Sequence, residues 1–374
     1  MKYYIVAGEA SGDLHASYLM RALRQRDPQA DFRCWGGDRM EAEGGKIVKH
    51  YKDLAFMGFV EVALNLRIIL NNINLCKTDI LNYNPDALIL VDYPGFNLRI
   101  AKFAKKKNIK VFYYISPQVW AWKKNRVHAI RENVDKMLTI LPFEKDFYAK
   151  YDYPVEYVGH PLVEEIDDRV KNDGRIETFK QRYGFGEKSI VALLPGSRRQ
   201  EISKMLPVMA AAAEAFPDFQ FVVSAVPSFP LDFYHKLLKN RNLPIVVDET
   251  YPLLLNARAA LVTSGTATLE TALLNVPEVV CYKGNLFSYL IARFLIKGIK
   301  YISLVNLIAD NLVVKELIQN ELNIKNITNE LSRLLEDGEP RVNMLRQYDD
   351  LKYKLGGSGA SDKAAEVIIQ GIGK

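Results

Sequence analysis

The sequence predicts an α/β protein built from two doubly wound domains, followed by a helical C-terminal tail. Short runs rich in Val, Ile, Tyr and Phe alternate with longer segments of helical period, which is typical of βαβ units and parallel sheets. These runs are mostly apolar without alternation, as expected of strands that helices cover on both faces. The length of 374 residues, at about 150 residues per domain, favours two domains over one.

Two series of strands are predicted along the chain. The first covers residues 3–7, 32–35, 87–91, 111–115, 137–141 and 155–158, and the second covers 190–194, 220–225, 245–247, 260–263 and 279–282. Stretches of helical period lie between them, such as residues 13–26 and 201–215. After about residue 311 the strand pattern ends, and helices are expected over 313–321, 327–336, 342–355 and 363–369.

A polar stretch over residues 164–187 separates the two strand series and predicts a domain boundary. We therefore expect an N-terminal domain over residues 1–170 and a C-terminal domain over residues 171–340. A helical tail over residues 341–374 is expected to pack back on an N-terminal domain. Two successive βα series are what twin doubly wound domains would give.

The positive charge is concentrated in one segment. The chain has 50 Lys and Arg against 44 Asp and Glu, a net charge of +6. Ten of the basic residues, and no acidic residue, fall between Arg99 and Arg131, so the rest carries 40 positive and 44 negative charges, a net of −4. Hydrophobic residues at 49% and charged residues at 25% exclude disordered, collagen-like and mucin-like classes.

Three features predict a cytoplasmic or membrane-peripheral protein. The three cysteines are too few and too scattered for a disulfide framework or a metal cluster, which indicates a reducing compartment. The N-terminus lacks the apolar region and small-residue cleavage site of a signal peptide. No uninterrupted apolar stretch approaches the ~18 residues that span a bilayer.

A glycine-bearing turn, Gly8-Glu9-Ala10-Ser11-Gly12-Asp13, follows the first predicted strand and opens a helix. Open α/β sheets bind ligands at such strand ends, so Gly12 is a candidate binding residue. The dinucleotide fingerprint and the P-loop are absent, which leaves NAD and a Walker-type ATP site without support. Asp13 either faces a ligand or is an early-turn acid favoured by the helix dipole.

Two later loops join a buried strand to a helix in the predicted C-terminal domain. Gly196 lets the backbone approach a ligand, Ser197 can cap the helix, and Arg198 can neutralise a phosphate; the alternative is a capped turn with surface arginines. In the second loop, the hydroxyls and amides of Ser264, Gly265 and Thr266 suit a diphosphate. Glu270, one helical turn past Thr266, would face the same ligand and accept hydrogen bonds from ribose hydroxyls.

Asp92 follows the apolar strand over residues 87–91 and so lies at the carboxyl end of a strand. A carboxylate there can act as a general base, and the alternative is a helix cap or a hydrogen bond to the next loop. His15, His128 and His160 share no spacing that implies a metal site. The chain contains no Asp-x-Asp, which disfavours a metal-dependent sugar transferase of the single-domain type.

Two segments suggest an amphiphilic ligand or a lipid surface. From Leu54 to Leu70, 13 of 17 residues are apolar, so this segment is either a buried core helix or pressed against lipid. The basic segment from Arg99 to Arg131 includes Trp120 and Trp122, a combination that suits an anionic membrane. Nucleic acid would also attract basic residues, but no recognised binding motif is present and the rest of the chain is net acidic.

Several motifs together resemble the lipid-A-disaccharide synthase family, bacterial glycosyltransferases of the GT-B fold. The Ser-Pro-x-Val-Trp-Ala-Trp block is the most specific of them. The matching pieces, in order, are Gly8-Glu9-Ala10-Ser11-Gly12-Asp13, Val91-Asp92-Tyr93-Pro94-Gly95-Phe96-Asn97, Ser116-Pro117-Gln118-Val119-Trp120-Ala121-Trp122, Leu141-Pro142-Phe143-Glu144, Val158-Gly159-His160-Pro161, Leu194-Pro195-Gly196-Ser197-Arg198 and Ser264-Gly265-Thr266-Ala267-Thr268-Leu269-Glu270.

The resemblance implies an inverting transfer of 2,3-diacylglucosamine from its UDP derivative to the 6-hydroxyl of 2,3-diacylglucosamine 1-phosphate. The implied products are the β-1,6-linked disaccharide 1-phosphate and UDP. Members of the GT-B fold place the acceptor in the N-terminal domain and the nucleotide in the C-terminal domain, across a cleft and without a bound metal. The resemblance also implies a place on the cytoplasmic face of the inner membrane, and C-terminal helices exchanged between two subunits.

Carried over residue by residue, the resemblance makes Asp92 the general base and Arg198 the diphosphate contact. It assigns Ser264, Gly265, Thr266 and Glu270 to UDP. An important asparagine of the family falls on Asn306, where Val305 replaces the family's proline. Some members carry a second acid in the Asp92 loop, where this chain has Gly95.

Two other functions remain open at this point. A UDP-N-acetylglucosamine 2-epimerase shares the GT-B architecture but acts on a soluble sugar nucleotide, for which the apolar segment from Leu54 to Leu70 has no use. A non-catalytic protein that binds a nucleotide sugar would close its cleft without chemistry.

Overall fold

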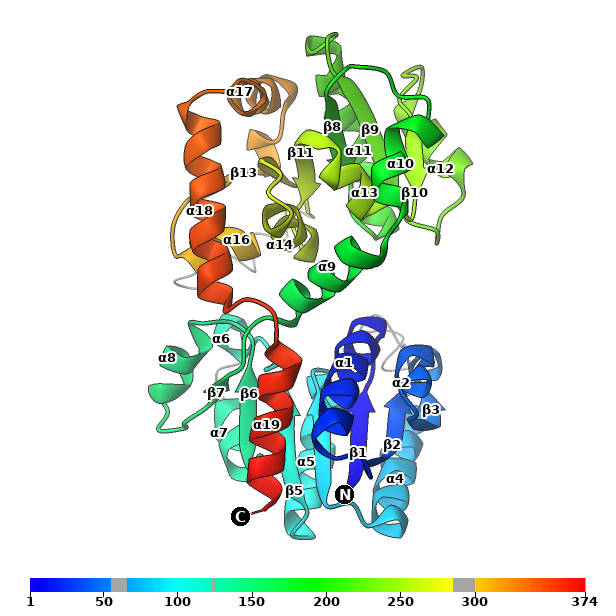
Figure 1. Cartoon of the computed structure of the whole chain (residues 1–374), viewed down its shortest axis with the longest axis vertical. Coiled ribbons are helices and arrows are strands. Elements are labelled where there is room, and N and C mark those ends of the chain that lie inside the picture. The colour runs from blue at the N-terminus through cyan, green and yellow to red at the C-terminus, as the bar shows by residue number, and fades with distance from the viewer. Residues whose placement is uncertain (55–65, 123–125, 285–299, 374) are drawn as a thin grey trace. The chain divides into compact units, whose positions relative to one another are not determined.

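The computed structural model describes residues 1–54, 66–122, 126–284 and 300–373 of the chain. The fold divides into two units (Figure 1). Unit 1 comprises Met1–Pro161 with Leu355–Lys374, and unit 2 comprises Leu162–Lys354. The division between the units falls nine residues before the boundary expected at 170/171.

Unit 1 contains a sheet of seven parallel strands in the order β3-β2-β1-β4-β5-β6-β7. Successive residues of one strand face different hydrophobic clusters: Tyr4 packs in one and Tyr3 in the other. Both faces are therefore covered, which explains the unbroken apolar runs. The strands are β1 (Lys2–Ala7), β2 (Asp31–Gly36), β3 (Lys46–His50), β4 (Ala87–Val91), β5 (Lys110–Tyr114), β6 (Lys136–Thr139) and β7 (Glu156–Tyr157).

Helices cover both faces of this sheet. α1 and the C-terminal helix α19 pack against each other (Figure 1), and the core cluster that contains Leu19 and Ile368 lies beneath them. The helices are α1 (Ala10–Arg26), α2 (Asp38–Ala42), α4 (Leu66–Tyr83), α5 (Pro94–Lys106), α6 (Val119–Trp122), α7 (Arg126–Asn133), α8 (Glu144–Ala149) and α19 (Ala360–Ile372), with a 3₁₀ turn η1 (Tyr51–Asp53).

Unit 2 repeats this architecture with six parallel strands in the order β10-β9-β8-β11-β12-β13. The strands are β8 (Ile190–Leu194), β9 (Gln220–Ala225), β10 (Ile245–Val247), β11 (Ala257–Thr263), β12 (Glu278–Tyr282) and β13 (Lys315–Ile318). The helices are α9 (Pro161–Asn172), α10 (Arg175–Arg182), α11 (Arg199–Ala212), α12 (Leu231–Leu238), α13 (Thr250–Leu255), α14 (Thr266–Leu273), α16 (Leu304–Ala309), α17 (Ile324–Leu335) and α18 (Glu339–Leu355), with 3₁₀ turns η2 (Ala213–Ala215) and η3 (Gln319–Glu321). The predicted class of two doubly wound domains is confirmed.

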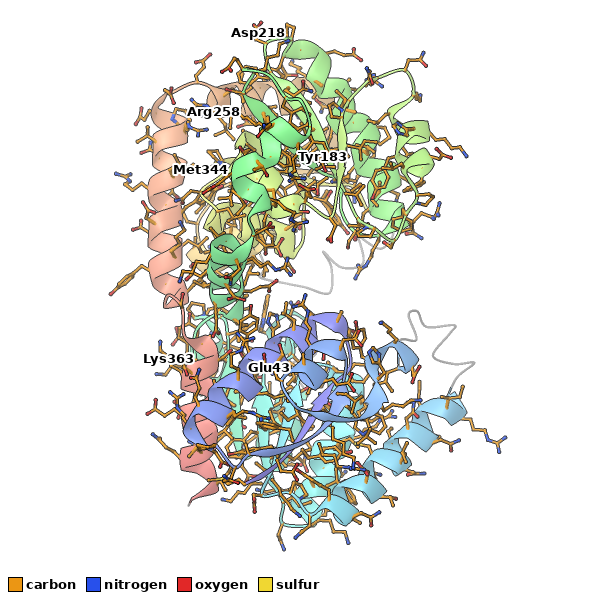
Figure 2. The ribbon with its side chains drawn as sticks, turned by 45° about the vertical axis from the view of Figure 1, so that its right-hand side comes forward. Glu43, Tyr183, Asp218, Arg258, Met344 and Lys363 are labelled. Carbon is orange, nitrogen blue, oxygen red and sulfur yellow. The ribbon has the colours of Figure 1, made fainter. Side chains whose placement is uncertain are left out.

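One local expectation was wrong, and the structure adds detail to two others. The helix expected over 313–321 is strand β13 followed by η3, because residues 315–318 pair with β12. The polar boundary stretch over 164–187 is largely helical, forming most of α9 and all of α10. The tail does not act as one piece: Met344 of α18 is buried in unit 2, whereas Lys363 lies on α19 in unit 1 (Figure 2).

Candidate active site

A cavity of about 270 Å³ opens at the carboxyl ends of β4, β5 and β6 in unit 1. These three strands are neighbours in the sheet, so the residues that follow them meet at one edge. The wall of the cavity is formed by Asp92, Pro94, Ile115, Ser116, Pro117, Gln118, Val119, Arg126, Ile140, Leu141 and Glu144. The predicted base, Asp92, therefore lies in a cavity that also contains a second carboxyl group and a guanidinium.

The backbone at this edge is strained. Asp92 and Tyr93 have φ of 43° and 50°, and Ile115 has φ of 65°. Left-handed backbone is unfavourable for a β-branched residue such as Ile115, and each such conformation costs on the order of 1–3 kcal/mol. The Asp92 carbonyl is held by the Asn97 amide (Nδ2···O 2.7 Å) and the Tyr113 hydroxyl (2.5 Å). The strain is thus maintained by buried groups beside the cavity, as is common at functional sites.

The carboxylate of Asp92 is not a helix cap. The N-cap of α5 is Tyr93, and it makes no side-chain capping bond. Burial first, and then the negative charge of Glu9, raise the pKa of Asp92 to about 6 against the opposing effect of the Tyr93 amide N–H. A carboxylate with a pKa near neutral can accept a proton far better than an ordinary exposed one.

Glu144 is a second buried carboxyl group in the same cavity, and it is not among the residues predicted from the sequence. Burial raises its pKa to about 7, and the amide N–H of Leu141 is the strongest of the groups that oppose the shift. Its signal in the sequence was the motif Leu141-Pro142-Phe143-Glu144, which places an acid just after β6.

The Asp13 carboxylate, in the first turn of α1, is bound by backbone amides at the start of a neighbouring helix. Its buried carboxylate accepts hydrogen bonds from the amides of Gly37 (2.6 Å), Arg39 (3.2 Å) and Met40 (3.2 Å) and thereby covers the N-terminus of α2. Gly12 lies in the first turn of α1, where a Cβ would be 3.3 Å from the Cβ of Ala7. A glycine at this position lets the helix approach β1 closely.

In the loop after β8, the side chain of Glu201 binds two backbone amides. Glu201 Oε2 accepts from the amides of Ser197 and Arg198, both at 3.3 Å, and its other oxygen lies 3.5 Å from the Arg198 guanidinium. Ser197 does not cap α11, because the helix begins at Arg199 and its N-cap is Arg198. Both side chains are exposed, so Arg198 is accessible to an anion.

The loop after β11 leads into α14. Gly265 and Thr266 are exposed at its N-terminus, where the first amides of a helix lack intrahelical partners. The Ser264 hydroxyl donates to the Ile302 carbonyl (3.2 Å). Burial first, and then the charge of Glu165, raise the pKa of Glu270 to about 7 against the opposing charge of Arg169. Unit 2 thus places exposed amides and a partly buried acid on the first two turns of one helix.

Asn306, which matches the family's important asparagine, is bound by other groups of the same unit. It is fully buried, and its amide nitrogen donates to the Val314 carbonyl (2.8 Å) and to Glu316 Oε1 (2.9 Å). Its oxygen accepts from the amides of Val313 (2.8 Å) and Val314 (2.9 Å). An asparagine side chain offers two donors and two lone pairs, so the protein already uses all four. The Asn306 side chain therefore holds the segment over Val313–Val314 to Glu316.

The membrane-related expectations lie partly outside the described residues. Of the segment from Leu54 to Leu70, residues 55–65 are not described; Leu54 is buried, and Ile68 and Leu70 are exposed. No helix within the described ranges is long and apolar enough to cross a membrane. Those ranges also contain no group of three His, Cys, Asp or Glu side chains arranged to hold a metal ion.

Comparison with known proteins gives one consistent family. The family model for lipid-A-disaccharide synthetase matches residues 3–370. A lipid-A-disaccharide synthase of Trichlorobacter lovleyi is 39% identical over 372 residues, covering 98% of this chain and 96% of that protein. One of Nitrosococcus oceani is 41% identical over 372 residues, covering 98% and 95%.

Solved structures with a similar fold are more distant in sequence. A UDP-GlcNAc 2-epimerase of Neisseria meningitidis, bound to UDP-GlcNAc, is 14% identical with a TM-score of 0.65, covering 100% of this chain and 99% of that one. A calicheamicin glycosyltransferase is 15% identical with a TM-score of 0.60, covering 100% and 98%. At this identity the likeness concerns the fold alone, which is the predicted GT-B architecture.

Proposed function

The chain belongs to the lipid-A-disaccharide synthetase family, and we propose that the Asp92 cavity is where its acceptor sugar is activated. The protein is a glycosyltransferase of lipid A biosynthesis that joins UDP-2,3-diacylglucosamine to 2,3-diacylglucosamine 1-phosphate. The observation that supports this site best is Asp92 itself: a partly buried carboxylate with a raised pKa, on strained backbone, in a cavity at the carboxyl edge of the sheet.

In the proposed step, Asp92 removes the proton of the acceptor 6-hydroxyl. The oxygen attacks the anomeric carbon of the donor as the bond from that carbon to the diphosphate oxygen breaks, and UDP leaves with the electron pair. A single displacement inverts the anomeric centre and gives the β-linkage. Arg198 and the amides of Gly265 and Thr266 are suited to stabilise the charge that develops on the diphosphate. The proposal involves no bound metal, so EDTA should leave turnover unchanged.

Three incubations test this function against the two alternatives. With both lipid substrates present, the transferase releases UDP; with the donor alone, it does not. With UDP-GlcNAc alone, the epimerase alternative predicts conversion to the 2-epimer, whereas the transferase leaves it unchanged. A non-catalytic sensor would change none of the three mixtures. Absence of UDP release with both intact substrates would contradict the proposal.

Glu270 is proposed to hold the ribose of UDP. Replacing it with Gln should weaken UDP binding about tenfold at pH 8, because a hydrogen bond to a charged acceptor is lost. The pKa of Glu270 is raised to about 7, so wild-type affinity should also fall as the pH drops through 7 and the carboxylate is protonated. Calorimetric titration with UDP at pH 6 and pH 8 measures both effects.

The control for this experiment is Glu336→Gln, which removes one charge from an exposed position of the same unit. It should leave both the affinity and its pH dependence unchanged. Equal UDP affinities for Glu270→Gln and the wild type at pH 8 would remove Glu270 from the binding site.

We place the protein on the cytoplasmic face of the inner membrane, with helices α4 and α5 of unit 1 toward the lipid. These helices pack side by side (Figure 1). Three basic residues of α5, Arg99, Lys102 and Lys106, are exposed and share one helix face at spacings of three and four residues. Among the side chains that the structure describes in α4, Ile68, Leu70, Leu75 and Leu81 are apolar and exposed. Basic and apolar groups together suit an anionic bilayer.

Reversing two of these charges, Lys102→Glu with Lys106→Glu, should lower binding to anionic phospholipid vesicles by at least about tenfold, since each basic residue near the surface contributes about 1 kcal/mol. Vesicle sedimentation measures the bound fraction. A matched control, Lys325→Glu, reverses an exposed charge in unit 2 and should leave binding intact. Undiminished binding of the double variant would place the membrane contact elsewhere.

The proposal includes a homodimer that exchanges its C-terminal helices. Within one chain, α19 packs on α1, the Arg26 guanidinium lies 2.6 Å from Asp362, and Ile368 is fully buried. In an exchanged dimer the same contacts would form between α19 of one copy and unit 1 of the other, so this apolar interface supports either arrangement.

A further inference from the structure

Glu144 is held by its own loop through one carboxylate oxygen, and the Ser116 hydroxyl also lies close enough to lower the pKa of this carboxyl. Oε2 accepts hydrogen bonds from the amides of Ile140 (3.2 Å) and Leu141 (3.0 Å), which fixes the side chain at the start of α8. Oε1 accepts no hydrogen bond from either amide. The residue is 1% exposed, and it lines the Asp92 cavity. A buried carboxylate oxygen beside a cavity is a strong acceptor for a ligand donor.

A donor without a partner lies next to this acceptor. The indole Nε1 of Trp120 is buried and makes no hydrogen bond to the described residues, although it lies close enough to Glu144 to lower the pKa of that carboxyl. The Trp120 ring packs edge-on against Phe143, the residue before Glu144, with centroids 4.9 Å apart. A buried N–H without a partner is costly, so a ligand atom that accepts from it would be favoured.

The pair has the hydrogen-bonding pattern that a sugar hydroxyl requires, because a hydroxyl both donates and accepts. The acceptor named above carries a phosphate at C1, an amide at C2 and an ester at C3. Its free hydroxyls are therefore those at C4 and C6, and the 6-hydroxyl is the one that reacts at Asp92.

We propose that Glu144 and Trp120 form a subsite for the 4-hydroxyl of the acceptor, and that this contact turns the 6-hydroxyl toward Asp92. The 4-hydroxyl donates to the carboxylate of Glu144 and accepts from the indole of Trp120. The inference rests on the proposed function, since it takes the acceptor from it. It adds a residue pair that selects the acceptor by its configuration at C4.

The test measures steady-state kinetics of wild type and Glu144→Gln with the natural acceptor and with its 4-deoxy analogue. Glutamine keeps one oxygen for the amides of Ile140 and Leu141 but replaces the other with a donor. We expect the acceptor KM of the variant to rise about ten- to hundredfold, while the donor KM stays unchanged. For the wild type, the KM of the 4-deoxy acceptor should exceed that of the natural acceptor by the same factor. For the variant, the two acceptors should have similar KM values, because the contact to the 4-hydroxyl is already gone.

Two further variants keep this test decisive. Asp146→Asn removes an exposed acid from the first turn of the same helix and should behave as wild type. Trp120→Phe keeps the ring but removes the N–H, and should show a smaller rise in acceptor KM. If Glu144→Gln fails to fold, the comparison of the two acceptors with the wild type still tests whether the 4-hydroxyl is bound.

A wild type that uses both acceptors equally well would overturn the subsite, and so would a folded Glu144→Gln with unchanged acceptor KM. Both outcomes require a wild type that releases UDP with the natural substrates. A wild type that does not would instead contradict the proposed function.

Discussion

Asp92→Asn should lower kcat by about a thousandfold and leave UDP affinity unchanged. General base catalysis contributes about 10²–10⁴-fold, and an amide cannot take the proton of the acceptor hydroxyl. Asparagine tolerates the left-handed backbone that Asp92 adopts, so the variant should fold normally. Turnover of the two lipid substrates and calorimetric UDP binding measure the two quantities.

The control for this substitution is Asp152→Asn, because Asp152 has the same kind of backbone, with φ of 52°, at an exposed site of the same unit. It should turn over at the wild-type rate. An Asp92→Asn variant that also turned over normally would remove Asp92 from the role of base.

The pH dependence of kcat/KM is a second test of the role of Asp92. With a pKa of about 6, Asp92 loses its function as a base when protonated, so kcat/KM should fall as the pH drops through 6. The negative charge of Glu9 contributes to the raised pKa. Glu9→Gln should therefore move this acidic limb to lower pH.

Asn306→Ala should destabilise unit 2 by about 3–5 kcal/mol and lower its melting temperature by about 10 °C. The substitution removes four buried hydrogen bonds, to the amides of Val313 and Val314, the Val314 carbonyl and an oxygen of Glu316. Glu316 also accepts from the amides of Ile302 and Ser303, and Ile302 in turn accepts from Ser264. Loss of UDP affinity should therefore accompany the loss of stability.

Thermal denaturation followed by circular dichroism measures the stability change. Asn311→Ala provides the matched control, since Asn311 lies nearby but is exposed, and it should shift the melting temperature by less than about 2 °C. If Asn306→Ala kept its melting temperature and lost turnover more than a hundredfold, Asn306 would touch substrate after all.

The strands that the sequence predicted best are those buried on both faces. Ala87–Val91 and Ile190–Leu194 were predicted with their observed bounds, because an unbroken apolar run of five residues has few alternatives in a parallel sheet. Strand β3 (Lys46–His50) was missed since it is charged and only half-buried at the sheet edge. Strand β13 was missed because its Lys-Glu-Leu-Ile sequence acquires strand structure only by pairing with β12.

The site residues that could be predicted from the sequence are those that directly follow a buried strand. Asp92 was found because an acid directly follows a buried strand, and strand order then brings it to the cavity. Glu144 was missed because it comes five residues after β6, and only the fold of the β6–α8 loop turns it into the cavity. The roles of Asp13 and Asn306 depended on hydrogen-bond partners 24 to 27 and 7 to 10 residues away, which a sequence does not display.

The most direct test of this account is the product formed by the purified chain from UDP-2,3-diacylglucosamine and 2,3-diacylglucosamine 1-phosphate. UDP release is followed enzymatically, and the configuration of the new glycosidic bond is determined by NMR. One UDP should be released for each disaccharide 1-phosphate formed, and the new linkage should be β-1,6. An α-linked product would contradict the single displacement, and release of no UDP from the intact substrates would contradict the transferase itself.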